Sequence, residues 1–275
     1  MDVRVLYTDI DGTLVGPGGD LLATSDRAPT VAAAWALVEA RRAGLEVVAL
    51  SGRARAGVAE LSRLLGISTF FCELGAVRVY DGGANEATTP GAWRGDGPAS
   101  QALRPAVAAL VAASGGELEE HSPWNAGRVH SLMVRGRLDV VTASRWLDGN
   151  GFDWVEVADN GVIPRGFDTL PSGLPVVRVY HLSPKGVSKR AAILADQAHR
   201  GLDIAECAAI GDARADAECH DVVGRCFVMA NGLAADPTIA DVIAGAPNVT
   251  ITSRGHTEGY ADAVADLLGL DPPGA

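Results

Sequence analysis

A pair of acidic residues closes an apolar run near the start of the chain. Asp9 and Asp11 follow "VRVLYT" and precede Gly12, in the stretch "YTDIDGTL". Aspartate is a poor strand former, and two anions on one short segment repel each other. A hard cation with oxygen ligands removes that repulsion, and Mg²⁺ typically takes one or two carboxylates together with phosphate oxygens and water. The pair therefore predicts a metal and phosphate site at the end of this segment.

Two further polar segments follow apolar runs later in the chain. Ser51, Gly52 and Arg53 come after "LEVVAL", and Asp212 comes after "CAAIG", with Asp216 four residues further on. In an open parallel sheet, ligands bind beyond the carboxyl ends of the strands. We therefore expect these side chains to meet the first acidic pair in one cleft.

The neighbouring groups suit a phosphoryl ligand. Ser51 offers a hydroxyl, and the backbone N–H groups around Gly12 and Gly52 can bind phosphoryl oxygens. Lys189, which follows "SPKGVS", supplies a compact positive charge. Carboxylates are known nucleophiles that form aspartyl-phosphate intermediates. Together, these residues predict phosphoryl transfer in which the protein positions the phosphoryl group and neutralises its charge.

Alternating strands and helices must place these residues. The apolar runs Val3–Thr8 and 45–50 are typical of buried parallel strands. Helical patterns follow over Asp26–Ala43 and Arg55–Leu65, and the last third of the chain repeats this alternation. The pattern predicts an α/β fold with a Rossmann-like, doubly wound parallel sheet covered by helices on both faces.

The middle of the chain differs in composition and periodicity. The stretch "GGANEATTPGAWRGDGPAS" has little periodicity and reads as a loop or linker, and a second group of helices and strands follows it. Within that group, Asp159-Asn160-Gly161 predicts a tight turn between two strands. We expect a core made of residues 1–82 and 184–275, with a smaller α+β domain inserted at residues 83–183.

Composition argues against several classes of function. The chain has 34 acidic and 23 basic residues, a net charge of −11, which disfavours binding to nucleic acid or to an anionic membrane. It carries neither a secretory leader nor an apolar stretch of membrane-spanning length, so we expect a cytoplasmic location. The four cysteines show no CxxC pair, which disfavours a zinc site or a disulfide framework, and we expect buried thiols.

Four segments carry a resemblance to a known family. "DIDGT", "LSGR", "GVSK" and "IGDARAD", in this order, resemble the four motifs of the haloacid dehalogenase (HAD) superfamily of phosphatases. An insert between the second and third motifs resembles the C2 cap of the Cof-type and sucrose-phosphate-phosphatase-like subgroup. "CELGAVRVYDGG" and "VMANG" are also similar to segments of that subgroup.

The resemblance implies a role for each matching residue. Asp9 would be the nucleophile and a Mg²⁺ ligand, and Asp11 the general acid and base, with its backbone carbonyl on the metal. Asp212 would bind Mg²⁺ directly, and Asp216 directly or through water. The phosphoryl oxygens would be held by residues of three motifs: Gly12, Ser51, Gly52 and Lys189. Lys185 competes for the lysine role, but "GVSK" before a helix favours Lys189.

The chain also departs from the subgroup pattern. Ser51 replaces the commoner Thr and keeps the hydroxyl, and Ala215 stands where the subgroup has Asn. Leu74 replaces an Asn that usually faces the substrate, so a particular substrate does not carry over. Residues with polar or aromatic side chains in the insert are candidates for contacting the substrate: Trp124, Asn125, Arg128, Arg178 and His181. Arg53 would orient the acids or the phosphate, or form a structural ion pair, and Asn231 would support the acidic loop.

These expectations combine into one hypothesis with two rivals. The main hypothesis is a Mg²⁺-dependent phosphatase that hydrolyses a small phosphomonoester, a sugar or polyol phosphate, through an aspartyl-phosphate. The rivals are a phosphomutase of the phosphomannomutase type and a non-catalytic phosphosugar-binding protein. We expect a small phosphorylated metabolite as the partner, no nucleic acid or membrane, and a monomer or homodimer.

Overall fold

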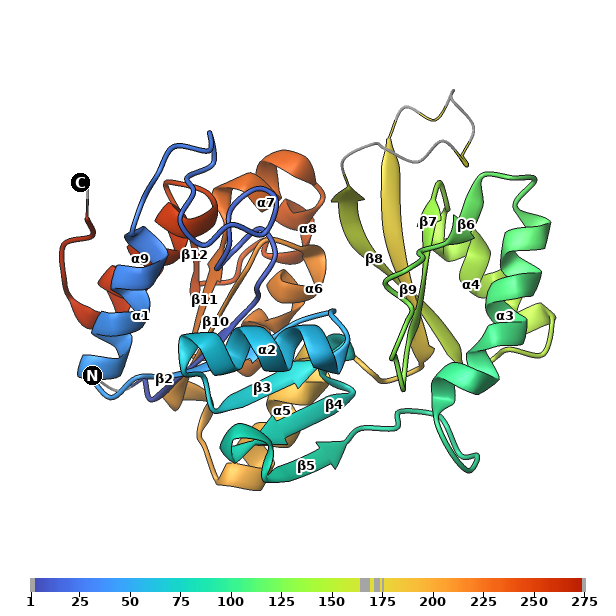
Figure 1. The fold of residues 1–275 in the computed structure, drawn as a ribbon, viewed down its shortest axis with the longest axis horizontal. Coiled ribbons are helices and arrows are strands. Elements are labelled where there is room, and N and C mark those ends of the chain that lie inside the picture. The colour runs from blue at the N-terminus through green and yellow to red at the C-terminus, as the bar shows by residue number, and fades with distance from the viewer. Residues whose placement is uncertain (1–2, 164–168, 171–173, 175, 274–275) are drawn as a thin grey trace.

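The computed structural model describes residues 3–163, 169–170, 174 and 176–273, which form two sheets with helices packed against them (Figure 1). The large sheet has the strand order β12-β11-β10-β1-β2-β3-β4-β5. Its strands are β1 (Val5–Thr8), β2 (Glu46–Leu50), β3 (Thr69–Cys72), β4 (Val77–Tyr80), β5 (Asn85–Thr88), β10 (Cys207–Gly211), β11 (Arg225–Val228) and β12 (Val249–Ile251). The strands from β12 to β3 run parallel, and β4 and β5 extend the sheet in antiparallel fashion.

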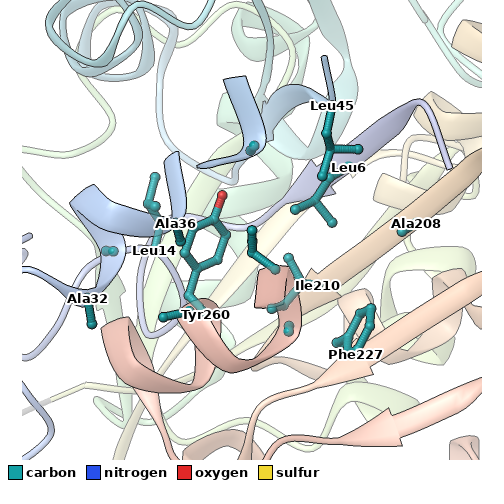
Figure 2. Packing of buried hydrophobic residues seen from close by; sticks show 14 of the residues in the cluster. Leu6, Leu14, Ala32, Ala36, Leu45, Ala208, Ile210, Phe227 and Tyr260 are labelled. Carbon is teal, nitrogen blue, oxygen red and sulfur yellow. The ribbon is translucent and has the colours of Figure 1, made fainter. Parts of the chain in front are cut away.

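Helices cover both faces of the large sheet. The helices of this part are α1 (Ala32–Arg42), α2 (Arg55–Leu65), α5 (Lys189–Arg200), α6 (Arg214–Ala217), α7 (Ala230–Ala235), α8 (Ile239–Val242) and α9 (His256–Leu268). On one face, α1 and α9 pack side by side. Figure 2 shows Tyr260 of α9 among small side chains of α1 such as Ala36, with Leu6 and Ile210 of the sheet nearby. On the other face, Tyr7 packs with Ile193 of α5. The expected fold class is confirmed.

A second, smaller layer lies beside the large sheet, and we call it the cap. It contains an antiparallel sheet of order β6-β7-β9-β8 with two helices, α3 (Ala99–Ala113) and α4 (Val140–Gly149). Its strands are β6 (Leu118–Glu120), β7 (Leu132–Gly136), β8 (Val155–Ile163) and β9 (Val177–Pro184). One face of this sheet packs on α3 and α4, while β8 also contacts α6 (Figure 1). The cap sheet therefore has its helices on one face and contacts the large-sheet domain through β8.

Three local expectations are wrong, each for a physical reason. The stretch expected as a loop contains β5, an exposed edge strand without an apolar pattern that pairs with β4. The turn expected at Asp159-Asn160-Gly161 is instead an irregularity within the continuous strand β8, because both flanks pair with β9 and Gly161 absorbs the distortion with a positive φ. The helix expected from Asp26 begins only at Ala32, since Pro29 cannot continue a helix interior and pairs with Ala23 instead.

Two sequence expectations concern cysteines and membranes. Cys72, Cys207, Cys219 and Cys226 are all buried free thiols, as expected. Among the described residues, the helices are too short or too polar to cross a bilayer.

Candidate active site at the carboxyl edge of the large sheet

Three carboxylates meet where two neighbouring parallel strands end. Asp9 follows β1 and Asp212 follows β10, and the N–H of Asp9 donates to the carbonyl of Ile210 at 2.9 Å, so the strands stay paired up to the acids. One oxygen from each of Asp9, Asp212 and Asp216 can be chosen so that all three lie within 4.8 Å of one another. Hard carboxylate oxygens at this spacing are the donors that Mg²⁺ prefers. The side chains present therefore fit this metal.

A buried lysine lies against this cluster. Lys189 is the first residue of α5, whose N-terminus is capped by the Ser188 hydroxyl, which accepts the N–H of Ala191 at 3.1 Å. Its Nζ donates to Oδ1 of Asp9 at 2.6 Å and to Oδ1 of Asp216 at 2.7 Å. The side chain is only 4% exposed, so water screens these contacts poorly.

Burial and mutual repulsion shift the acids away from their usual ionisation. Burial, with the charges of Asp216 and Asp11, raises the pKa of Asp9 to about 7, although Lys189 opposes the rise. Burial and the charges of Asp9 and Asp216 likewise hold the pKa of Asp212 well above its usual range. Burial alone would lower the pKa of Lys189, but the attraction of the two acids outweighs it and the pKa is raised. Ionisation of all these acids together is therefore unfavourable beside one ammonium alone, and a bound cation would relieve this cost.

Glycines allow the acids to approach the backbone. Gly12 has φ +82°, and a Cβ on it would lie 2.1 Å from Oδ2 of Asp212. A Cβ on Gly211 would lie 2.0 Å from Cγ of Asp216. A side chain at either position would displace a carboxylate, so both glycines shape the candidate metal site.

Asn231 ties the acidic loop to the rest of the site. Its Nδ2 donates to the carbonyl of Gly12 at 2.9 Å and lies 3.4 Å from Oδ2 of Asp212. Its Oδ1 accepts the N–H of His256 at 2.9 Å, at the start of α9. Asn231 therefore links Gly12 and the loop of Asp212 to the start of α9.

Asp11 and Arg53 form a bidentate ion pair beside the cluster. Nε and one terminal nitrogen of Arg53 donate to the two oxygens of Asp11 at 2.7 and 2.5 Å. The Asp11 side chain is 57% exposed, whereas Asp9 is buried, so the two acids of the first motif have different environments. This contact is an ion pair that fixes the guanidinium of Arg53 against Asp11.

Ser51 is also at this edge, and Lys185 is not. Ser51 follows β2, is buried, and its Oγ accepts the N–H of Arg53 at 3.2 Å. Lys185 instead pairs with Asp148 of α4 at 2.8 Å, an exposed contact within the cap. Of the two competing lysines, Lys189 is therefore the one at the acidic cluster.

The candidate substrate-contacting residues of the cap have different surroundings. His181 is 1% exposed and lies against Gly52, where a Cβ would be 2.9 Å from its Nε2. Arg178 pairs with Asp159 at 2.7 Å and lies 3.5 Å from Asp236, at the end of α7.

Two cap candidates make contacts within the cap itself. Trp124 is half exposed and stacks on His121, and the side chain of Asn125 pairs with the backbone of Met133 in both directions. The remaining candidate, Arg128, reaches the loop after β2 by donating to the carbonyl of Gly52 at 2.8 Å.

Two residues of the turn between β3 and β4 also contact the cap. Leu74, which stands in place of the subgroup's Asn, packs with Val187 and with Ala158 of β8. Glu73 was not among the candidates from the sequence, yet its fully buried carboxylate accepts hydrogen bonds from the cap. Its one sequence signal is a charged residue directly after the apolar "TFFC".

Comparisons with known proteins concern the fold and one segment of the chain. Residues 177–249 match the family model of haloacid dehalogenase-like hydrolases. The sucrose-phosphatase of Synechocystis, solved with sucrose and phosphate, superposes with a TM-score of 0.65 at 15% identity, covering 97% of this chain and 98% of that one. The chain has the haloacid dehalogenase fold. The resemblance noted in the sequence is thereby confirmed.

Other solved structures share this HAD fold. A haloacid dehalogenase-like hydrolase from Bacteroides thetaiotaomicron gives a TM-score of 0.63 at 14% identity, covering 96% of this chain and 99% of that one. A structure described as a HAD subclass IIB sugar phosphatase gives 0.61 at 17% identity, with coverage of 97% and 99%. None of the curated proteins matches the sequence.

Proposed function

We propose that this protein is a Mg²⁺-dependent phosphatase that hydrolyses a small phosphomonoester through an aspartyl-phosphate on Asp9. The observation that carries the proposal is the position of Asp9, buried at a strand end with Lys189 at 2.6 Å and with Asp212 and Asp216 beside it. The HAD fold and the sugar phosphatases among its structural neighbours support the same reading.

Asp9, Asp212 and Asp216 are the side chains that would hold Mg²⁺ in this site, joined by the backbone carbonyl of Asp11. The bound ion would neutralise charge on the phosphoryl oxygens and on the acids. Lys189 contributes a second, permanent positive charge. Because Lys189 contacts Asp9, it favours the ionised form of the nucleophile against the effect of burial, and it lies close to where a phosphoryl group must bind.

The reaction divides between the two acids of the first motif. A carboxylate oxygen of Asp9 attacks phosphorus, the bond to the leaving oxygen breaks, and Asp11 gives its proton to that alkoxide. Asp11, now ionised, takes a proton from the water that attacks the phosphoryl group, which releases phosphate and restores both carboxyl groups. Both oxygens of Asp11 accept from Arg53 in this structure, so at least one of these bonds must be released before Asp11 can carry the proton that it gives to the leaving group. Ser51 and the N–H groups near Gly12 and Gly52 bind the phosphoryl oxygens.

The substrate class follows from the neighbours and from the cap. One neighbour was solved with sucrose and phosphate, and another is described as a sugar phosphatase. His181 lies beside the loop that carries Ser51, and both of its ring nitrogens lack a hydrogen-bond partner among the described residues. A neutral imidazole can donate to and accept from hydroxyl groups. A sugar or polyol phosphate is therefore the substrate class that we propose.

Phosphate release from a panel of phosphorylated metabolites tests this function. With Mg²⁺ present, the wild type should release phosphate and Asp9→Asn should not, while keeping its circular dichroism spectrum. Asp96→Asn is the matched control, because Asp96 is exposed and lies outside the acidic cluster, and it should behave as the wild type does. Isomerisation of a hexose phosphate with little free phosphate would identify a phosphomutase instead. Binding without turnover would identify a non-catalytic phosphosugar-binding protein.

A further inference from the structure

The cap touches the proposed phosphate-binding loop at Gly52. One terminal nitrogen of Arg128 donates to the carbonyl of Gly52 at 2.8 Å. A Cβ on Gly52 would lie 2.9 Å from Nε2 of His181 and 3.3 Å from Oδ1 of Asn160. The residue before it is Ser51, whose hydroxyl faces the N–H of Arg53. The cap therefore contacts the backbone of the loop that carries this hydroxyl.

The guanidinium of Arg128 is fixed by several acceptors. Besides Gly52, it donates to the carbonyl of Trp124 at 3.0 Å and to Oγ of Ser131 at 2.8 Å, and it lies 3.2 Å from Sδ of Met133. Arg128 as a residue is only 8% exposed. A planar fork that satisfies acceptors in three directions holds one orientation, which a lysine cannot reproduce.

Glu73 anchors the same cap segment from the core side. Its carboxylate accepts the N–H groups of Val129, His130 and Ser131 at 2.8, 2.9 and 2.8 Å, and the Ser131 hydroxyl at 2.8 Å. It is fully buried, so these donors replace its hydration. Moving the cap away would break all four bonds together.

The turn that contains Glu73 is also hydrogen-bonded to the phosphate-binding loop. The N–H of Glu73 donates to the carbonyl of Arg53 at 3.0 Å, and the N–H of Leu74 donates to the carbonyl of Ser51 at 3.1 Å. Glu73 and Leu74 have φ +52° and +61°, a left-handed backbone that non-glycine residues rarely adopt. Such a conformation persists when the surrounding contacts over-determine it.

We infer that Arg128 and Glu73 are positioning residues that couple seating of the cap to the conformation of the Ser51–Gly52 loop. Arg128 donates a hydrogen bond from the cap to the loop. Glu73 accepts hydrogen bonds from the cap segment next to Arg128. The turn that contains Glu73 also donates hydrogen bonds to the loop from the core. The loop reaches its phosphate-binding conformation when the cap is seated. The catalytic consequence rests on the proposed phosphatase function, whereas the structural coupling does not.

Hydrogen exchange measured by mass spectrometry tests the coupling without reference to activity. In Arg128→Gln, peptides covering the amides of residues 51–53 and 73–74 should exchange at least tenfold faster than in the wild type. Arg137→Gln is the matched control, because Arg137 is a cap arginine that is 61% exposed and pairs with Glu117. Wild-type exchange at these amides in folded Arg128→Gln would overturn the inference.

A milder variant keeps the test decisive where the first is poorly folded. Ser131→Ala removes one donor to Glu73 and one acceptor of Arg128 and leaves the main chain unchanged. It should raise exchange at residues 51–53 severalfold, and unchanged exchange there would contradict the coupling.

Kinetics separate positioning from general stability. With p-nitrophenyl phosphate, Arg128→Gln and Glu73→Gln should each lower kcat at least tenfold with a smaller change in KM. Their double variant should lose less than the product of the two single losses, because both act through one segment. Arg128→Lys should not restore kcat. Multiplicative losses, or rescue by lysine, would contradict the inference. A wild type without turnover would sink the phosphatase proposal and leave the exchange test standing.

Discussion

Replacing Lys189 with methionine should destabilise the metal-free protein by about 3–5 kcal/mol, the usual cost of removing one partner of a buried ion pair. Methionine fills a similar volume but removes the ammonium that lies 2.6 Å from Asp9 and 2.7 Å from Asp216. These carboxylates are 9% and 7% exposed, so water cannot replace the lost charge. The protein then stays folded only if these acids take up protons or move apart.

Thermal unfolding in EDTA measures this cost against a matched lysine. At about 2–4 °C for each kcal/mol in larger domains, the Tm of Lys189→Met should fall by roughly 6–20 °C. Lys185→Met is the control, since Lys185 also contacts a carboxylate, at 2.8 Å, but is 43% exposed. An exposed pair contributes less than about 1 kcal/mol, so this variant should remain close to the wild type.

Mg²⁺ should return part of the lost stability, because it binds the same acids in the folded state. At a free concentration about one hundred times its Kd, a ligand adds about 2.7 kcal/mol. Equal losses of Tm in the two lysine variants would refute the argument from burial. An absence of Mg²⁺ stabilisation in both the wild type and Lys189→Met would refute the assignment of the acids as metal ligands.

Gly12→Ala should weaken Mg²⁺ binding by about 10–100-fold in calorimetric titration, because the new Cβ would meet Oδ2 of Asp212 at 2.1 Å. Gly18→Ala has a similar positive φ but open space around it, so it should keep the wild-type affinity, and equal losses would implicate backbone strain alone. Burial holds the pKa of His181 well below its usual range, so below about pH 6.5 the unfolded chain binds a proton there that the folded chain does not. Stability from this residue is therefore lost as pH falls below about 6.5, and His181→Leu should lose less stability than the wild type in urea unfolding between neutral pH and about pH 5. Equal losses in the two proteins would show that His181 is protonated in the folded state.

The acidic cluster could be predicted from the sequence because its cause is local. Asp9 and Asp212 each follow an apolar strand, and the carboxyl ends of parallel strands meet at one edge of a sheet. The structure brings Asp9 and Asp212 together on this principle, with Asp216 of α6 and Lys189 of α5 beside them. The choice of Lys189 over Lys185 comes from the resemblance of "GVSK" before a helix, and the structure places Lys189, the first residue of α5, beside the acids.

The contacts between cap and core could not be read in the same way. Glu73 and Arg128 are far apart in the sequence, and their roles depend on how the two layers dock. Edge strand β5 lacks an apolar face, so no periodicity revealed it. The turn signal at Asn160-Gly161 was overridden by pairing along β9, which is a tertiary effect. The boundaries of the inserted domain remain a prediction.

The central claim is that Asp9 is the nucleophile, and trapping the intermediate tests it most directly. The protein is mixed with Mg²⁺ and a phosphomonoester that it hydrolyses, quenched in acid within one turnover, and digested for mass spectrometry. The account predicts one added phosphoryl group on the peptide that contains Asp9, lost on treatment with hydroxylamine and absent from Asp9→Asn. Turnover with no phosphorylated Asp9, or with the phosphoryl group on another residue, would contradict it.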